Sequence, residues 1–454
     1  MQTDTIAAIS TPLGEGGIGA VRISGEDAFK IAKKVFKPIN NKDIEKMSGY
    51  TAAFGKVYDG DELLDEGVLL VFRAPKSYTG ENVVEISVHG GTHLIRKVLR
   101  AVISAGARLA EGGEFTKRAF LNGKMSLTEA ESVMSLISAK SDRALNIATR
   151  NKNGALSNKI KSMTDKLLYL VSQISVFSDF PEDETLCISE DDFLVSLKDI
   201  EKGLDSLIAD YDKGRLIIEG INTVIVGSPN AGKSTLMNLL SKTQRSIVTS
   251  IAGTTRDVVE QTAKVGDYIL FLADTAGIHE TDDEVEQIGI KQALSRLNTA
   301  DLCLAVFDTS VPVTEDDKKI LEQIKGKNTL LVLNKNDLET SFNEYYESLG
   351  IPFVKISALT GSGEEDLVNA ITELLKLGEL DQNAEMLSNE RQYQRVLKAK
   401  NSINEAISAL ESGVTLDAVG ILIDDGLSSL LELDGKKITV EVADEVFKNF
   451  CVGK

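Results

Sequence analysis

The sequence of 454 residues predicts a multidomain α/β protein, with an α/β domain at the start, an all-helical domain in the middle and a second α/β domain whose sheet is mainly parallel. Three observations predict this fold. The length suffices for about three domains that each bury a core. Helical periodicity replaces mixed strand and helix patterns at Ser126. Strand, loop and helix patterns then repeat from about Glu219, as they do in parallel sheets.

The first domain is expected to span residues 1–118. β-rich runs such as "EGVLLVFRA" and "ENVVEISVHGG" alternate there with runs of helical periodicity such as "AFKIAKKVF" and "LIRKVLRAVISAG". We therefore expect an α/β domain in which helices pack on a sheet.

The middle of the chain is expected to be all helical. Ser126 and Glu129 form a capping-box pattern that predicts the start of a helix, and apolar residues follow at helical spacing. Helical patterns return after about residue 380, for example in "NERQYQRVLKAKNSINEAISAL". Because the two ends of an α/β domain tend to lie close together, residues 119–217 and 381–454 are expected to form one helical domain into which residues 218–380 are inserted.

The composition limits the classes of protein that fit. The formal net charge of −19 argues against a chain that grips nucleic acid by itself, so an RNA substrate needs a basic partner or a local basic patch. Three cysteines, Cys187, Cys303 and Cys451, lie far apart, which indicates neither a disulfide framework nor a zinc site. Neither an apolar run near the roughly 20 residues of a membrane-spanning helix nor a signal segment is present. We expect a cytoplasmic protein without a membrane partner.

A glycine-rich loop, "GSPNAGKS", follows the predicted strand "INTVIV" and precedes the predicted helix "TLMNLLS", which is the order that a phosphate loop requires. Gly227 and Gly232 are expected to let backbone N–H groups turn toward phosphate oxygens. Lys233 is expected to reach the β- and γ-phosphates, and the Ser234 hydroxyl to ligate Mg²⁺. The residues expected to bind the nucleotide here are Asn230, Ala231, Gly232, Lys233, Ser234 and Thr235.

A second phosphate element, "DTAG", ends the strand "YILFLA". Asp274 is expected to hold Mg²⁺ through water, and the Gly277 N–H to contact the γ-phosphate.

A base-recognition pattern, "NKND", ends a later strand, and "SAL" follows the last one. The Asp337 carboxylate can accept two hydrogen bonds from guanine, whose N–H and NH₂ donors adenine lacks. Because a buried carboxylate left unpaired costs a few kcal/mol, we expect a guanine base. The expected base pocket comprises Asn334, Lys335, Asp337, Ser357 and Ala358. The four elements in this order resemble the translation-factor class of GTPases, which predicts a Ras-like P-loop GTPase domain that binds GTP.

The glutamine that orients the attacking water in Ras-like enzymes is missing, since Ile278 stands at that position. Catalytic help is therefore expected from elsewhere. One source is a monovalent cation held by the Asn230 amide, Thr254 and backbone carbonyls near residues 249 and 251. Another is the acidic run "ETDDEVEQIGI", for which a solvated face is the alternative. The residues expected to ligate metal ions are Ser234, Thr255, Asn230, Thr249, Ile251 and Thr254.

Seven motifs are spread over the whole chain. They are "STPLGEGGIGAVRISG", "SYTGENVVEISVHGG", "GEFTKRAFLNGKMSLTEAE", "GSPNAGKS", "IVTSIAGTTRDVVE", "DTAGIHETDDEVEQIGI" and the final "FCVGK". Together they resemble the MnmE family of tRNA-modification GTPases, also called TrmE. The resemblance implies a tetrahydrofolate-binding N-terminal domain that dimerises, a central helical domain, and an inserted GTPase domain that is stimulated by potassium and dimerises in cycles driven by GTP hydrolysis.

The resemblance also implies a reaction and partners. With an FAD-dependent partner of the MnmG type, the family builds an aminomethyl-type (carboxymethylaminomethyl) group on C5 of the wobble uridine of certain tRNAs. The chain is therefore expected to act as a homodimer in a complex with that partner, and to meet tRNA mainly through it.

Individual residues receive roles from the same resemblance. Those that would contact the folate, a 5-formyl- or 5,10-methylene-tetrahydrofolate, are Arg22, Glu85, Lys124 and Lys454. Those that would act in catalysis are Glu286, which would position the hydrolytic water, Lys233 and Cys451. Two interpretations of Cys451 stay open: a thiol that acts on a one-carbon intermediate, or a small apolar residue that closes a helix.

Two other classes of function remain open. A ribosome-assembly GTPase needs a basic RNA-binding module, and the net-acidic helical flanks argue against it. In a regulatory switch that binds effectors without taking part in chemistry, Arg22, Glu85 and Lys124 would have no ligand to bind. Failure to bind folate would therefore favour the regulatory switch.

Overall fold

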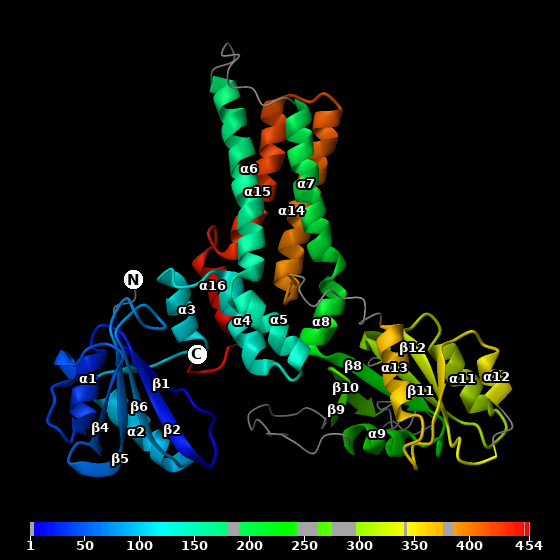
Figure 1. Ribbon diagram of the computed structural model, residues 1–454, viewed down its shortest axis with the longest axis horizontal. Coiled ribbons are helices and arrows are strands. Elements are labelled where there is room, and N and C mark those ends of the chain that lie inside the picture. Colours follow the sequence, from blue (N-terminus) through cyan, green and yellow to red (C-terminus); the bar gives the residue numbers. More distant parts are fainter. Residues whose placement is uncertain are drawn as a thin grey trace, which may run out of the picture. The chain divides into compact units, whose positions relative to one another are not determined.

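The computed structural model describes residues 4–179, 190–242, 261–274, 297–339, 343–375, 385–448 and 450–453. Contacts between residues divide the chain into two compact units, each with one sheet (Figure 1). The first unit comprises Met1–Met134, Lys152–Leu197 and Lys398–Lys454, and the second comprises Ser135–Asn151 and Lys198–Leu397. The domain boundaries expected near residues 118, 217 and 380 stay predictions.

The first unit contains a seven-stranded sheet in the order β3-β4-β5-β6-β2-β1-β7. Its strands are β1 Ile6–Ile9, β2 Gly16–Ser24, β3 Phe36–Pro38, β4 Thr51–Asp59, β5 Glu62–Phe72, β6 Val83–Gly90 and β7 Arg108–Leu109. Neighbouring strands are antiparallel except β1 and β7, which are parallel. Along β4 the side chains of Ala53 and Val57 are buried and those of Phe54 and Lys56 are exposed, as expected for a sheet with one covered face.

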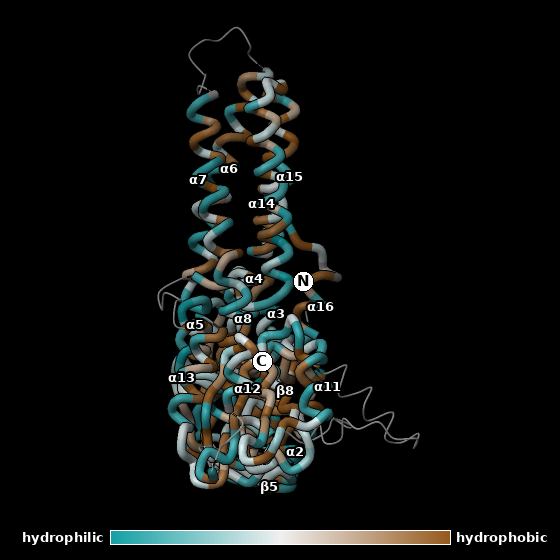
Figure 2. Tube along the Cα trace, turned by 90° about the vertical axis from the view of Figure 1, so that its right-hand side faces the viewer, coloured by the Kyte–Doolittle hydropathy of each residue, from teal (hydrophilic) through white to brown (hydrophobic). Residues whose placement is uncertain are grey.

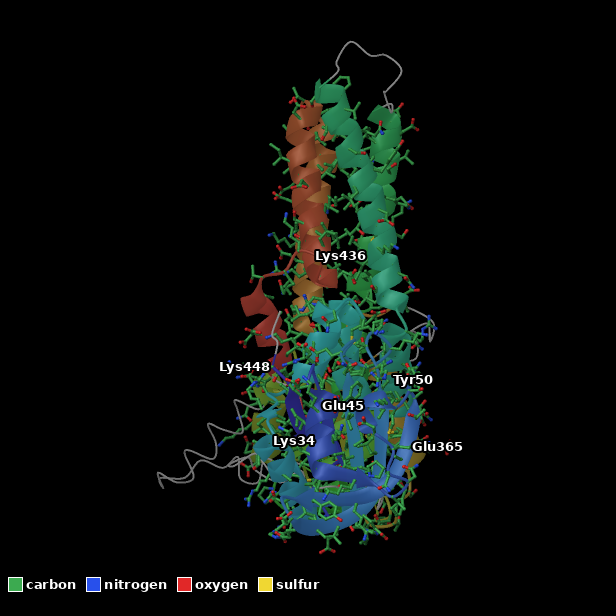
Figure 3. All side chains as sticks on the ribbon, turned by 90° about the vertical axis from the view of Figure 1, so that its left-hand side faces the viewer. Lys34, Glu45, Tyr50, Glu365, Lys436 and Lys448 are labelled. Atoms are coloured by element: carbon green, nitrogen blue, oxygen red, sulfur yellow. The ribbon has the colours of Figure 1, made fainter. Side chains whose placement is uncertain are left out.

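Helices α1 (Ala28–Val35) and α2 (Thr92–Ser104) cover one face of this sheet (Figure 1). Phe29 and other apolar side chains of the helices form one core with the buried residues of the strands. Lys34, labelled in Figure 3, donates from Nζ to the carbonyl of Ala105 at 2.8 Å, and Ala105 is the C-cap of α2. The α/β fold predicted for the start of the chain is confirmed.

The middle and the end of the chain are helical. The helices outside the two sheets are α3 Glu114–Leu121, α4 Leu127–Ser138, α5 Asp142–Lys152, α6 Ala155–Asp179, α7 Glu190–Ala209, α8 Tyr211–Glu219, α14 Glu390–Glu411, α15 Leu416–Asp434 and α16 Val440–Lys448. The predicted capping box at the start of α4 is present, since the Ser126 N–H donates to Glu129 Oε2 (2.6 Å) and the Glu129 N–H donates to Ser126 Oγ (3.2 Å). In the described part of the chain, no helix is both long and apolar enough to cross a membrane.

Helices α6 and α15 pack against each other in the first unit. Figure 2 shows hydrophobic and hydrophilic residues alternating along both helices. The buried positions of α6 include Met163, Leu167 and Ile174, which recur at the spacing of a helix face. Gly420 of α15 lies against Ile174, where an added Cβ would come within 3.1 Å of the isoleucine side chain. Close helix packing therefore requires a small residue there.

The second unit contains a six-stranded sheet in the order β13-β12-β11-β8-β10-β9. Its strands are β8 Ile221–Gly227, β9 Gln261–Val265, β10 Tyr268–Asp274, β11 Leu302–Asp308, β12 Thr329–Asn334 and β13 Phe353–Lys355, and its helices are α9 Lys233–Lys242, α11 Glu315–Gln323, α12 Asn343–Glu347 and α13 Glu364–Leu374. All pairs are parallel except β9 with β10. The carboxyl ends of the five parallel strands therefore lie at one edge, where open α/β sheets bind ligands.

The segments before and after the parallel sheet meet within the second unit. Tyr211 of α8 stacks on Tyr393 of α14 with ring centroids 4.3 Å apart, and its hydroxyl donates to Glu390 Oε2 at 2.9 Å. Asn151 Nδ2 of α5 donates to the carbonyl of Met386 at 2.8 Å. Helical segments on both sides of the sheet are thus joined, and the predicted insertion of an α/β domain into a helical domain is confirmed.

Candidate functional site

The phosphate loop connects β8 to α9 at the carboxyl edge of the parallel sheet. Asn230 and Gly232 adopt left-handed backbone conformations, with φ of 61° and 101°. A Cβ on Gly232 would lie 2.1 Å from Asn334 Nδ2, so only glycine fits. Gly227 has an ordinary backbone, and its Cβ would lie 2.4 Å from the carbonyl oxygen of Val306. Glycine is therefore needed at position 227 because the neighbouring strand approaches too closely for a side chain. The expected turn of its N–H toward phosphate stays a prediction.

Lys233 is the first residue of α9. Its ammonium donates to the carbonyl oxygens of Gly227 and Ser228 at 2.8 and 2.9 Å, so the cation lies across the loop. Ser234 follows in the first turn of the helix with an exposed side chain. Backbone amides at a helix start, an ammonium and a hydroxyl fit a phosphate chain with a bound Mg²⁺.

Asn334 ends β12 and joins the phosphate loop to the base loop. Its side chain, 3% exposed, donates from Nδ2 to the carbonyl of Ala231 at 2.8 Å and accepts from the N–H of Ala358 at 2.9 Å. Ser357 is buried as well, and its Oγ accepts a hydrogen bond from the Thr360 N–H at 3.2 Å. One buried amide therefore fixes both halves of the nucleotide site.

The chain turns sharply after Asn334. Lys335 has a left-handed backbone with φ of 67°, the N–H of Asn336 donates to the carbonyl of Ile356 (3.0 Å), and the N–H of Leu338 donates to the carbonyl of Lys335 (2.9 Å). The turn carries Asp337, whose side chain is exposed. The expected burial of this carboxylate against a guanine base stays a prediction. Its two acceptor oxygens still suit the two donors of guanine.

A second group of charged side chains lies on the sheet of the first unit. Arg22 of β2 and Glu85 of β6 face each other in register, and Arg22 Nε donates to Glu85 Oε1 at 2.8 Å. The guanidinium lies 5.5 Å from the ring centroids of both Tyr78 and Phe115. Arg22 also donates to the carbonyl of Gly453 at 3.2 Å. A cation, a carboxylate and two aromatic rings thus meet at one point.

The last residues of the chain dock beside this group. Gly112 and Val452 form an isolated antiparallel bridge, and the N–H of Gly113 donates to the carbonyl of Cys451 at 3.3 Å. The Cys451 side chain is exposed. The terminal segment is therefore held by its backbone, with the thiol outside.

A loop over residues 75–82 carries Tyr78. Lys124 donates from Nζ to the carbonyl of Pro75 at 3.0 Å, and Asn122 Nδ2 donates to the carbonyl of Thr79 at 2.7 Å. Burial raises the pKa of Tyr78, although a hydrogen bond with Thr116 and the nearby Arg22 act in the opposite direction. Lys124 contacts this loop, whereas Arg22 and Glu85 contact each other.

The sequence matches two family models, one described as the MnmE helical domain over residues 127–451 and one described as the N-terminus of the GTP-binding protein TrmE over residues 5–124. It is 43% identical to the tRNA modification GTPase MnmE of Carboxydothermus hydrogenoformans, with 100% of both chains covered. It is 40% identical to that of Clostridioides difficile, with 99% of each covered. The chain belongs to the MnmE family.

Membership in the MnmE family makes the chain a GTP hydrolase of the tRNA modification class, which binds GTP and Mg²⁺. The phosphate loop and the base loop both lie inside the range matched by the helical-domain model, and Arg22 and Glu85 lie inside the range matched by the N-terminal model. Among solved structures, the G domain of the T. maritima FeoB iron transporter is 26% identical and covers 34% of this chain and 98% of its own. Its TM-score of 0.27 is too low to bear on the fold.

Several residues to which the MnmE pattern gives roles lie outside the described part of the chain. They are Thr249, Ile251, Thr254, Thr255, Gly277, Glu286 and Lys454. Asp274 is described as the last residue of β10, which places its backbone at the carboxyl edge of the sheet. The expected roles of these eight residues stay predictions.

Three further residues contact or flank the expected site residues and were not singled out in the sequence. Asp308 ends β11 beside the base loop, and Tyr78 and Phe115 flank Arg22. Asp308 had a detectable signal, because it is the last residue of a buried strand, as Asn334 is. Tyr78 and Phe115 lie inside two of the quoted motifs, "SYTGENVVEISVHGG" and "GEFTKRAFLNGKMSLTEAE", but their place beside Arg22 depends on how a helix and a loop cover the sheet.

Proposed function

We propose that this chain is a potassium-stimulated GTPase that works with an FAD-dependent, MnmG-type partner. Together they install an aminomethyl-type (carboxymethylaminomethyl) group on C5 of the wobble uridine of certain tRNAs, with a carbon unit from tetrahydrofolate. The observation that carries the proposal is the presence, in one chain, of a phosphate loop tied to a base loop and of a separate charged and aromatic site around Arg22.

In the nucleotide site each residue has a separate task. Lys233 stabilises the β- and γ-phosphates, Asp337 accepts from the guanine base, and Glu286 orients the hydrolytic water. Ser234 and Thr255 hold Mg²⁺, which neutralises charge that develops on the phosphates when it is bound. The charge that an arginine supplies in other GTPases comes here from potassium, held by Asn230 with Thr249, Ile251 and Thr254. Hydrolysis then drives cycles in which two G domains dimerise and separate.

The potassium assignment is tested by GTP hydrolysis in KCl and NaCl at equal ionic strength. We expect faster hydrolysis in KCl, and loss of that difference in Asn230→Ala. Asn222→Ala is a suitable control, because Asn222 is an exposed asparagine of the same unit. Equal rates of the wild-type protein in the two salts would contradict the assignment.

The site around Arg22 fits a folate. Glu85 can accept from the N–H donors of a pterin, and the rings of Tyr78 and Phe115 offer apolar surface beside it. Arg22, Lys124 and Lys454 supply positive charge for carbonyl and carboxylate oxygens of the ligand. Cys451, exposed beside this group, is available to a one-carbon intermediate.

Folate binding is tested by calorimetric titration with 5-formyl-tetrahydrofolate. Arg22→Met should weaken binding at least about tenfold, because a charge-assisted contact is lost. Arg96→Met is the matched control, since Arg96 is an exposed arginine on α2, which covers the opposite face of the sheet. Equal affinity of the two variants would remove the folate assignment and favour a regulatory switch.

Exposed apolar residues on the face of the first sheet that lies opposite α1 and α2 support a homodimer. Phe54 and Val68 are cross-strand partners and are 49% and 38% exposed. Val68 pairs in turn with Ser87, two residues from Glu85 on the same face of β6. A second copy that covers this apolar face would also cover the folate site, because Arg22 and Glu85 lie on the same face of the sheet.

Sedimentation analysis tests the homodimer. Phe54→Glu should shift the protein toward monomer. Val195→Glu, at an exposed apolar position of α7, should leave the dimer unchanged. A monomeric wild-type protein would contradict the proposal.

The net charge of −19 assigns tRNA binding mainly to the partner. Tight phosphate contacts need lysine and arginine in excess, so a basic surface of the MnmG-type protein is expected to supply them. We place the complex in the cytoplasm, because the cytoplasm contains both tRNA and GTP. No membrane partner is expected.

A further inference from the structure

Asp308 is an acidic residue that none of the roles above uses. It ends β11, and its register partner on β12 is Asn334. Its Oδ2 lies 2.5 Å from Nζ of Lys335, and its Oδ1 accepts from the N–H and the hydroxyl of Ser310 at 3.0 and 2.6 Å. The two side chains of the ion pair are 12% (Asp308) and 33% (Lys335) exposed.

The partner of Asp308 is the residue whose backbone makes the base loop turn. Lys335 has φ of 67°, a conformation that side-chain-bearing residues adopt at a cost in energy. The turn that follows brings the Asn336 N–H to the carbonyl of Ile356 and the Leu338 N–H to the carbonyl of Lys335. Asp337 sits inside this turn, so its orientation depends on Lys335.

A second, uncharged link joins the same two loops. Thr309 donates from its N–H and from Oγ1 to the carbonyl of Asn334, at 3.3 and 3.0 Å. This link fixes where the base loop begins. The ion pair with Asp308 fixes Lys335, the next residue. Together the two links restrict the orientation of the turn.

We propose that Asp308 is a positioning residue for guanine recognition: its carboxylate holds the Lys335 ammonium and thereby fixes the turn that presents Asp337 to the base. The proposal rests on the proposed role of Asp337. Burial alone raises the pKa of Asp308, and the hydrogen bonds from Lys335 and Ser310 outweigh it, so that the pKa lies below the ordinary value. Asp308 is therefore ionised at neutral pH and carries the charge that the role needs.

The test uses the full-length protein with two probes. A fluorescent GDP derivative labelled on the ribose reports binding of the whole nucleotide, and inorganic triphosphate, which has no base, reports binding at the phosphate loop. Asp308→Asn keeps the shape of the side chain and removes its charge. We expect it to weaken GDP binding about tenfold and to leave triphosphate binding within about twofold. In GTP hydrolysis it should raise KM and leave kcat unchanged.

A matched control is available at the other end of β11. Asp301 precedes the strand and pairs with Arg215 at 2.7 Å, with side chains 11% (Asp301) and 29% (Arg215) exposed. Asp301→Asn removes a comparable ion pair far from the base loop. Asp301→Asn should lower Tm about as much as Asp308→Asn does, and it should leave GDP binding unchanged.

A double-mutant cycle tests whether Asp308 acts through Lys335. In a Lys335→Met background, Asp308→Asn should cause no further loss of GDP affinity. The proposal is overturned by unchanged GDP affinity in Asp308→Asn, by an equal loss of triphosphate binding, or by an undiminished effect in the Lys335→Met background. Asp337→Ala separates this failure from failure of the proposed base site. If that variant binds GDP as the wild type does, the guanine assignment itself is wrong and the role of Asp308 falls with it.

Discussion

Asn334 Nδ2 donates a hydrogen bond to the carbonyl oxygen of Ala231 at 2.8 Å, so the residue that opens the base loop also closes the phosphate loop. The same amide accepts from the N–H of Ala358, which belongs to the third loop of the site. Loops that follow different strands are therefore coupled through one buried side chain. A nucleotide that orders one of these loops acts on all three.

Asn334→Ala should reduce both stability and nucleotide affinity. It removes two buried hydrogen bonds and leaves the Ala231 carbonyl and the Ala358 N–H without their partner, which costs about 2 kcal/mol of unfolding free energy. Urea denaturation and titration with GDP measure the two effects. Asn336→Ala is the control, because Asn336 is exposed in the same turn. Equal stability of the two variants would contradict the coupling.

Glu114 should give the first unit a specific sensitivity to acid. The residue is 4% exposed and accepts from Arg108 Nη2 (2.6 Å) and Arg118 Nη2 (3.0 Å). Burial raises the pKa of this carboxyl, but the hydrogen bonds from Arg108, the Glu111 N–H and Arg118 outweigh it, so that the pKa lies below its ordinary value of 4.5. A lowered pKa stabilises the folded state above the unfolded value, and the effect is lost as the pH falls through the folded pKa.

Glu114→Gln should therefore lose about 2 kcal/mol of unfolding free energy at neutral pH, because the buried Arg118 and the half-exposed Arg108 each lose one of their anionic hydrogen-bond partners. The difference in unfolding free energy between Glu114→Gln and the wild type should stay constant down to about pH 5 and shrink at lower pH. Denaturation curves at a series of pH values measure the gap. Glu26→Gln, at an exposed glutamate of the same unit, should show no gap at any pH. A gap for Glu114→Gln that persists unchanged at pH 3 would be inconsistent with this account.

The two described cysteines should differ in reactivity. Cys303 is 2% exposed, and burial raises the pKa of its thiol to about 12. Cys451 is exposed. A thiolate is the reactive form, so alkylation at pH 8 should label Cys451 quickly and Cys303 only after unfolding. Peptide mapping by mass spectrometry, in a Cys187→Ser background, separates the two sites, and rapid labelling of Cys303 in the folded protein would contradict its burial.

Much of the fold could be predicted because its signals are local. The strand "INTVIVG" coincides with β8, and Ser126 with Glu129 marks the start of α4, since both depend on residues a few positions apart. The phosphate loop could be placed for the same reason. The prediction that "NKND" ends a strand also depended on local signals, and β12 ends at Asn334.

The parts that could not be predicted depend on distant partners. Arg22 contacts Gly453 across almost the whole chain. No periodicity predicts that contact, and only the family resemblance, which assigned Arg22 and Lys454 to one folate, pointed to it. The need for glycine at position 227 comes from the Val306 carbonyl of the neighbouring strand. The exposure of Asp337 follows from the left-handed turn at Lys335, which the motif does not encode.

The most direct test of the central claim is mass spectrometry of nucleosides from bulk tRNA of cells with and without this protein. We expect the deletion to remove the C5-aminomethyl-type wobble uridines. The wild-type gene should restore them, and Lys233→Ala should fail to do so although the variant protein accumulates, because hydrolysis of GTP needs the phosphate-loop lysine. An unchanged nucleoside profile in the deletion would contradict the tRNA function and favour a role in ribosome assembly.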